Sequence, residues 1–310
     1  MTTGRAREWA KRWRGIVVLL VGIATILTNA PAAATGVAGG RLFPSTLLVE
    51  DTQNDDELEL PTVSWLRRGA NGETPAARQL AINGQMSRLL TPDLAVTVGT
   101  GWRRLDVVGS GRASGWENLD LGLKYRAFVN EPHEFLVSTG LFAEVGATGT
   151  RRVDAERFST IQPVVTFGKG WGDLPRDLDW LRPVALTGAA GVGVPTGAAP
   201  TTARYGLSLQ YSLYYLDRHT GIPIEPWLNR LIPLIEFSGE TPLGRSYDTR
   251  TTALAAPGIV WMGDTMQIAI EALIPLNRRT GRGVGVIAQA HFFLDEMMPS
   301  VFGKPLLARD

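Results

Sequence analysis

Polar residues, several of them ionisable and so able to do chemistry, alternate with apolar residues in several short segments of the chain. The clearest segment, residues 118–128, reads Asn-Leu-Asp-Leu-Gly-Leu-Lys-Tyr-Arg-Ala-Phe. In a β-strand, alternate residues point to opposite faces, so one face of this segment would be apolar and the other mostly polar. The same alternation along the chain gives the residues that we expect to face a lumen or to line a constriction: Asp120, Lys124, Arg126, Glu144, Glu236, Glu240, Glu271 and His291.

These side chains carry charges of both signs, which leaves two interpretations open. They could ring a narrow pore and select among solutes by charge. Equally, they could pair across a small lumen and fill it.

Residues suited to catalysis, metal binding or cofactor binding are sparse. The three histidines, His133, His219 and His291, are scattered without a close ligand pair, and cysteine is absent. The glycine-rich run 188–193 lacks the Lys-Ser/Thr of a phosphate loop and falls within a strand pattern. We therefore expect no enzyme activity, no catalytic residues, no cofactor and no metal site.

The elements that must position the polar residues are about twelve strands, each near the 9–11 residues that a tilted membrane strand needs. The expected fold is an all-β, transmembrane, antiparallel up-and-down β-barrel behind an N-terminal signal-peptide helix. Closure suits a membrane because lipid offers no hydrogen-bond partners to free strand edges. The expected strands are residues 57–67, 78–89, 93–104, 116–128, 134–147, 158–169, 182–194, 204–216, 231–242, 251–262, 265–276 and 284–294.

The connections between these strands differ in length, as they do in bacterial barrels. Short turns are expected at 90–92, 130–133 and 262–264, whereas the opposite side has longer, polar loops such as 105–115. Both ends of the barrel then lie on the short-turn, periplasmic side. The segments 170–181 and 217–230 on that side are long. They could form a small cap or surface turns, and 217–230 could include a short amphipathic helix around Trp227.

Tryptophans mark both edges of the expected membrane-spanning band. Trp65, Trp102 and Trp116 lie near the longer loops, and Trp261 lies near a short turn. Tryptophan favours membrane interfaces, so we expect these residues to form an interfacial girdle. Packing in the core of a soluble β-protein is the alternative.

The first 34 residues have the pattern of an export signal. A basic start precedes an uncharged, mostly apolar stretch at 15–28, and alanines at 32–34 suit cleavage. A permanent anchor helix is the alternative, since residues 15–34 reach the roughly 20 residues that a bilayer requires. The expected divisions are a signal peptide (1–34), an exposed periplasmic lead-in (35–56), an outer-membrane barrel (57–295) and a periplasmic tail (296–310).

Charge and composition limit the partners of the chain. Its 310 residues carry a formal net charge of only +1, which argues against a nucleic-acid partner, because nucleic-acid-binding domains are usually basic. The absence of cysteine excludes a disulfide framework and the usual lipid attachment site of a lipoprotein.

Two short segments resemble a known family. Residues 120–125, Asp-Leu-Gly-Leu-Lys-Tyr, and 302–306, Phe-Gly-Lys-Pro-Leu, are similar to segments of the transporter-like outer-membrane β-barrel family of the meta-pathway of phenol degradation. The resemblance implies a barrel linked to the uptake of hydrophobic or aromatic compounds, and it implies no catalytic residues. The chain continues to Asp310 after its last expected strand, so Phe292 or Phe293 would signal to the barrel-assembly machinery from an internal position.

From these observations we expect a channel or transporter-like protein of the bacterial outer membrane, which passes small molecules, including hydrophobic or aromatic ones, without an energy source. Its partners would be the lipid bilayer, the barrel-assembly machinery during insertion, and a solute that the sequence does not name. The alternatives are a plugged structural or adhesive barrel acting through its outer loops, and a secreted soluble β-protein.

Overall fold

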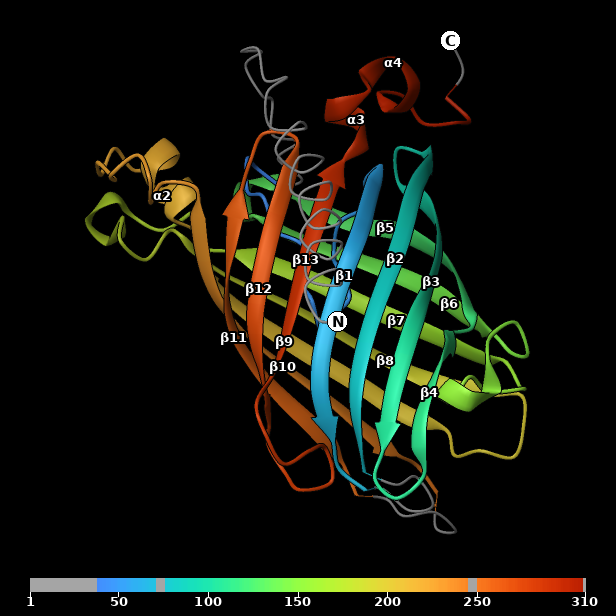
Figure 1. Ribbon diagram of the computed structural model, residues 1–310. Coiled ribbons are helices and arrows are strands. Elements are labelled where there is room, and N and C mark those ends of the chain that lie inside the picture. The colour runs from blue at the N-terminus through green and yellow to red at the C-terminus, as the bar shows by residue number, and fades with distance from the viewer. Residues whose placement is uncertain (1–37, 71–75, 245–249, 309–310) are drawn as a thin grey trace, which may run out of the picture. The chain divides into compact units, whose positions relative to one another are not determined.

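One antiparallel β-sheet forms most of the described chain and closes on itself (Figure 1). The computed structural model describes residues 38–70, 76–244 and 250–308, so the expected signal peptide, residues 1–34, lies outside it. Strands β4 and β5 both pair with β3 and share one position, so the ring has twelve positions. The strands are β1 (Glu57–Arg68), β2 (Ala77–Thr91), β3 (Leu94–Val107), β4 (Gly111–Trp116), β5 (Leu119–Asn130), β6 (Phe135–Val145), β7 (Thr160–Gly170), β8 (Val184–Pro195), β9 (Thr202–Tyr211), β10 (Leu231–Pro242), β11 (Thr252–Met262), β12 (Met266–Pro275) and β13 (Gly285–Phe293).

The ring is closed because its first and last strands, β1 and β13, pair with each other. The strands pair in chain order, which is the up-and-down arrangement that the sequence predicts. Every strand except β4, which pairs with β3 alone, therefore finds strand partners for its backbone hydrogen bonds on both sides, as a wall surrounded by lipid requires. The predicted all-β transmembrane barrel fold is confirmed.

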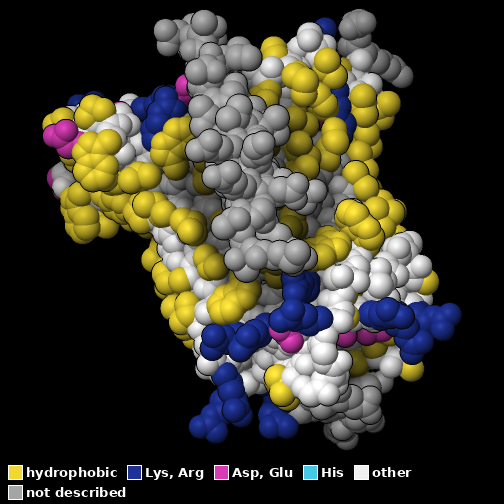
Figure 2. All heavy atoms as spheres, in the orientation of Figure 1, with side chains coloured by type: hydrophobic (Ala, Val, Ile, Leu, Met, Phe, Trp, Pro, Cys, Tyr) yellow, Lys and Arg dark blue, Asp and Glu magenta, His cyan; other side chains and the backbone are white. Residues whose placement is uncertain are grey.

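Alternation along the strands separates an apolar outer face from a polar inner face. In β9, Leu207 and Leu209 are 46% and 48% exposed, whereas Ser208 and Gln210 are 0% and 2% exposed. Figure 2 shows hydrophobic side chains over much of the visible barrel wall and Lys and Arg gathered at its lower end, where the longer loops lie in Figure 1. The outer face therefore suits hydrocarbon and the loop end suits water.

The described residues also form three short α-helices, α2 (Leu213–His219), α3 (Leu294–Met297) and α4 (Pro299–Phe302). None of the helices in the described ranges is long and apolar enough to cross a membrane. Helices α3 and α4 follow the last strand, and the N–H groups of Leu306 and Leu307 donate to the carbonyl oxygens of Leu89 and Leu90 at 3.0 and 2.8 Å. The C-terminal tail thus packs against the end of β2.

The predicted eighth strand is too long. Strand β9 ends at Tyr211, and the residues expected to continue it form α2. The hydroxyl of Ser212 caps this helix by accepting a hydrogen bond from the backbone N–H of Tyr215 at 3.0 Å. The short helix expected within 217–230 therefore does not form around Trp227, where the chain makes turns. Helix α2 begins earlier, at Leu213. Similarly, the last strand ends at Phe293, and Leu294 begins α3.

Two further differences lie near the segment 118–128. Residues 105–115, expected as a loop, instead continue β3 and begin β4, and the strand assignment is interrupted at Glu117 and Asn118. Phe128 follows the polar face in the sequence pattern, but the side chain is 51% exposed on the outer face. The reason is a shift in register between Arg126 and Phe128, which reverses the alternation.

The largest difference concerns residues 38–56, which the sequence predicts to be an exposed lead-in. Much of this segment is buried, including Phe43, Val49 and Asn54. It contacts inward-facing side chains of the strands, so it occupies the lumen of the barrel. The expectation of exposure is wrong because acidic residues of the segment find partners on the wall: Glu50 pairs with Lys124, and Asp56 pairs with Arg88.

The expected girdle tryptophans lie toward the two ends of the wall. Trp102 and Trp116 are direct partners across β3 and β4, and Trp65 lies in the second half of β1, toward the same loop end. Trp261 lies near the end of β11, at the opposite end, and is 38% exposed. These positions suit the two membrane interfaces, and the interfacial role stays a prediction.

The two faces of the wall predict different responses to a charge at the same depth. Val98 of β3 is 46% exposed on the outer face, and its partner on β2 is Met86. Gln85, the residue before Met86, points into the lumen. We expect Val98→Lys to lower the free energy of unfolding by about 2–4 kcal/mol, the cost of a lysine facing the bilayer midplane. The matched control, Gln85→Lys, should lower it by less than half as much, because the lumen is polar.

Urea unfolding of the folded barrel in lipid vesicles, followed by tryptophan fluorescence, measures both changes. Equal losses for Val98→Lys and Gln85→Lys would contradict the assignment of the two faces.

Candidate functional site in the barrel lumen

Residues 38–56, here called the inner segment, form a loop whose two arms both enter at the short-turn end of the barrel. In the first arm, the guanidinium of Arg41 is fully buried and pairs with Glu134 of the β5–β6 turn at 2.8 Å. In the second arm, Asp56 pairs with Arg88 near the end of β2. The carbonyl oxygen of Asp56 also accepts a hydrogen bond from the N–H of Leu294 at 2.8 Å.

Tyr215 of α2 completes the anchor of the first arm. Its hydroxyl donates to Glu134 at 2.8 Å, and the guanidinium of Arg41 lies 3.7 Å from the centre of its ring. Burial, with the hydrogen bond to Glu134, raises the pKa of Tyr215 to about 12, so the hydroxyl keeps its proton at neutral pH. The helix that the sequence did not predict therefore positions a residue that holds the inner segment.

The carboxylate of Glu236 holds the tip of the inner segment. Glu236 is fully buried on β10 and accepts hydrogen bonds from the backbone N–H groups of Leu47, Leu48 and Val49 at 3.0, 2.7 and 3.2 Å. Hydrogen bonds to a charged group each contribute about 1.5–3 kcal/mol. Because an unsatisfied buried N–H is costly, this carboxylate holds the place where the chain turns, together with Thr46, whose backbone N–H donates to Asp51 at 2.9 Å.

Other polar side chains of the wall bind the inner segment on both sides of its tip. The ammonium of Lys124 pairs with Glu50 at 3.6 Å and donates to the carbonyl oxygen of Asp51 at 3.3 Å. Gln267 accepts from the N–H of Ser45 at 3.2 Å and donates to its carbonyl oxygen at 3.1 Å. The lumen therefore supplies hydrogen-bond partners that a free loop would otherwise find in water.

Glycines of the wall allow the inner segment to lie close to it. A Cβ atom at Gly168 would stand 3.0 Å from the ring of Phe43, and one at Gly206 would stand 2.8 Å from Val49. Side chains at these two positions would compete for the same space. The abundance of glycine thus has a structural reason here, the close approach of two chain segments.

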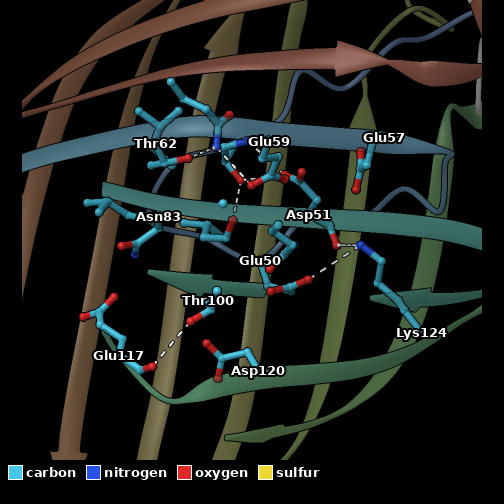
Figure 3. A pocket seen from close by; sticks show the side chains of 17 residues that line it. Glu50, Asp51, Glu57, Glu59, Thr62, Asn83, Thr100, Glu117, Asp120 and Lys124 are labelled. Carbon is cyan, nitrogen blue, oxygen red and sulfur yellow. Dashed lines mark hydrogen bonds and ion pairs between the residues drawn. The ribbon is translucent and has the colours of Figure 1, made fainter. Parts of the chain in front are cut away.

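Two cavities lie beside the tip, and both are lined by Leu48, Val49 and Glu50. The first, which we call the acidic cavity, has a volume of about 250 Å³ and lies between the tip and strands β1, β2, β3 and β5 (Figure 3). The ionisable side chains that line it are six carboxylates and one ammonium: Glu50, Asp51, Glu57, Glu59, Glu117, Asp120 and Lys124.

The second cavity, which we call the mixed cavity, has a volume of about 490 Å³ and lies on the other side of the tip. Its lining combines apolar residues such as Val164 and Leu254 with the ion pair between Arg204 and Glu240, whose atoms are 3.0 Å apart. A third cavity, lined by Phe43 and Phe293 nearer the short-turn end, has only about 10 Å³. Open volume in the lumen therefore lies mainly beside the tip.

The structure divides the predicted lumen residues into several groups. Lys124 and Glu236 bind the inner segment, whereas Asp120 and Glu240 line the acidic and mixed cavities. Glu144 accepts a hydrogen bond from the side chain of Asn118 at 2.8 Å. None of these contacts shows which residue limits passage, so a constriction stays a prediction.

The remaining predicted residues lie apart from the two cavities. Arg126 pairs with Asp93 of the β2–β3 turn at 2.8 Å. Glu271 is 1% exposed and lines neither cavity beside the tip, and His291 is fully buried beside Glu57. A charge change at Asp120 is therefore a better probe of ion selectivity than a change at Glu271.

A basic cleft at the loop end is a feature that the sequence did not single out. It has a volume of about 730 Å³ and is formed by the β1–β2 and β12–β13 connections with neighbouring residues. Arginines dominate its described lining: Arg67, Arg68, Arg78, Arg250, Arg278, Arg279 and Arg282. The loops contributing these residues are far apart in the sequence, and the net charge of +1 conceals their clustering.

The burial of the inner segment in the lumen is the structural feature that the sequence analysis did not predict. A signal was present, because Phe43, Leu47, Leu48 and Val49 form an apolar group just before the acidic run. Such a group in an otherwise polar connection favours burial.

No family model matches the chain, and no curated protein matches it. Among solved structures, the chain is similar to the COG4313 outer membrane channel from Pseudomonas putida F1, with a TM-score of 0.53 and 12% sequence identity. That similarity covers 81% of this chain and 99% of the other. At this level of identity it shows a shared fold, that of outer-membrane β-barrels.

The KdgM porin and the NanC porin are more distant, both with a TM-score of 0.45 and 9% identity. The KdgM similarity covers 76% of this chain and 98% of the porin, and the NanC similarity covers 75% and 98%.

The contacts of Glu236 predict that it controls how tightly the tip is held. The chain has no cysteine, so a cysteine placed at buried Ser45 gives a single thiol inside the lumen. In that background, we expect Glu236→Ala to raise the rate of labelling by a membrane-impermeant maleimide at least tenfold, because three backbone N–H groups of the tip lose their acceptor. Mass spectrometry of the folded barrel measures the rate.

Glu240→Ala is the matched control, since Glu240 lies on the same strand and pairs with Arg204 without holding the tip. The control should label like the parent. Equal labelling of parent and Glu236→Ala would show that Glu236 does not hold the inner segment in place.

Proposed function

We propose that this protein is a passive channel or transporter-like barrel of the bacterial outer membrane. In this proposal, small molecules pass through the lumen when the inner segment shifts, without a cofactor, catalytic residues or an energy source. The lipid bilayer surrounds the wall, and the barrel-assembly machinery inserts it, with Phe292 or Phe293 near the end of the last strand as the recognition signal.

The observation that carries the proposal is the pair of cavities beside the tip. Their volumes of about 250 and 490 Å³ lie inside a closed wall, and the segment between them is held by hydrogen bonds and ion pairs as well as by apolar contacts. Polar contacts can exchange with water when the segment moves. A modest displacement would therefore enlarge the cavities.

The lining of the mixed cavity supports small hydrophobic or aromatic solutes. Val49, Val164 and Leu254 offer apolar surface, and Arg204 with Glu240 offers polar contacts, a combination typical of small-molecule sites. The resemblance to the family of the meta-pathway of phenol degradation points to the same class of solute. The basic cleft at the loop end would attract solutes that also carry negative charge.

A plugged barrel acting through its outer loops is the second candidate function. The observation that favours it is the inner segment itself, which fills the short-turn end of the lumen and is anchored there by the buried Arg41–Glu134 pair. In this case the basic cleft would be the working surface, and the barrel would serve as its support.

Recordings in planar lipid bilayers distinguish the two functions. We expect the parent protein to give small, brief conductance steps and Glu236→Ala to lengthen the open time severalfold, because the tip is released. We also expect Asp120→Lys to shift the reversal potential in a salt gradient toward anion preference, since it reverses one charge of the acidic cavity.

Heat-modifiable mobility on gels confirms in each case that the barrel is folded. If folded parent and folded Glu236→Ala both fail to conduct, the channel proposal is wrong and the plugged barrel is favoured. If the barrel conducts but Asp120→Lys leaves the reversal potential unchanged, ions do not pass through the acidic cavity.

A further inference from the structure

We propose that Glu57, Glu59 and His291 form a binding site for a divalent transition-metal ion, of the kind represented by Zn²⁺, at the seam where the barrel closes. Glu57 and Glu59 belong to β1, the first strand, and His291 belongs to β13, the last. Glu59 and His291 are direct partners across these two strands. A bound ion would therefore join the first strand of the ring to the last.

The geometry brings one possible ligand atom from each residue into a small space. An imidazole nitrogen and one carboxylate oxygen from each glutamate all lie within 4.8 Å of one another. His291 Nε2 and Glu57 Oε2 lie 3.2 Å apart. Zinc–ligand bonds are about 2.0–2.2 Å long, so small side-chain rotations would bring the three atoms around one ion.

His291 supplies an independent sign of a missing partner. The residue is fully buried, its Nδ1 has no hydrogen-bond partner within the part of the chain that is described, and its Nε2 faces only the carboxylate of Glu57, at 3.2 Å. Buried polar groups in proteins nearly always have partners, so a buried imidazole with one unpaired nitrogen next to two carboxylates is an exception, and a metal ion would supply a further partner. The ion pair to Glu57 is a weaker alternative, because it engages only one of the two ring nitrogens.

Neighbouring residues orient one of the ligands. Gln289, next on the inner face of β13, donates from Nε2 to Glu59 Oε2 and to the hydroxyl of Thr62, both at 3.0 Å. Such contacts around a ligating carboxylate fix its orientation and commonly accompany metal sites. The donor set of one nitrogen and two oxygens suits Zn²⁺, Co²⁺ or Mn²⁺, whereas Ca²⁺ and Mg²⁺ prefer oxygen ligands alone.

The acidic cavity gives a cation a route to this site. Glu57 and Glu59 both line it, with four further carboxylates and the single ammonium of Lys124 (Figure 3). One of those carboxylates, Glu117, is already paired with Arg103, but the balance of the lining remains negative. A divalent cation would be attracted into the cavity and would meet the imidazole at its wall.

The sequence shows no two potential metal ligands from different strands close together, so it predicts no metal site here. Glu59 and His291 lie near opposite ends of the barrel sequence, and only the closure of the ring makes them neighbours. The site is also separate from the proposed function, because binding can be measured on the folded barrel whether or not it conducts.

Titration of the folded, metal-free full-length barrel with ZnCl₂ and CoCl₂ in detergent micelles tests the proposal. We expect one Zn²⁺ per chain by calorimetry, and visible absorption bands of bound Co²⁺. His291→Gln removes the nitrogen ligand and should weaken Zn²⁺ binding at least tenfold. Glu240→Gln, which removes a luminal carboxylate in the mixed cavity, should change the affinity less than threefold.

The thermal stability of the barrel gives a second readout, because a bound ion would link the first strand to the last. Free Zn²⁺ at 100 times its dissociation constant should raise the temperature at which the folded barrel unfolds, as seen by its change of mobility on gels. The rise should occur in the parent and in Glu240→Gln but not in His291→Gln. If His291→Gln does not fold, Glu59→Gln takes its place with the same expected losses. Absence of saturable binding to the parent, or equal binding by the parent and the folded ligand variant, would overturn the proposal.

Discussion

The closed ring of backbone hydrogen bonds is the constraint on which the other features of the structure depend. A wall in contact with hydrocarbon cannot leave N–H and C=O groups unpaired, so β1 must meet β13. Once the ring is closed with twelve positions, its lumen is too wide for side chains of the wall alone and too narrow for a broad channel. The inner segment, the ion pairs and the two cavities are the ways in which this chain fills that space.

Much of the wall could be predicted from the sequence, because side chains of a strand point alternately to its two faces. The alternation of apolar and polar residues therefore indicates which residues face lipid. Leu207 and Leu209 are exposed and Ser208 and Gln210 are buried, as the pattern requires. The errors arose where local interactions override alternation. Ser212 caps a helix within an apparently continuous strand pattern, and one shift of register turns Phe128 to the other face.

The contents of the lumen were less predictable, because they depend on contacts between residues distant in the chain. The pattern placed Lys124 and Glu236 inside, but not their partners, which are backbone groups and one carboxylate of the inner segment. Backbone acceptors and donors leave no mark in the sequence. Likewise, the sequence pattern shows His291 as an isolated histidine, because its neighbours Glu57 and Glu59 belong to the first strand and His291 belongs to the last.

Both arms of the inner segment enter at the short-turn end, through the anchors at Arg41 and Asp56. No part of the segment has to be threaded through the ring, since its tip can advance into the lumen as a hairpin and withdraw the same way. Biogenesis can therefore complete the wall first and fill it afterwards. In that order of events, the lumen would stay unfilled until the hairpin reaches the carboxylate of Glu236.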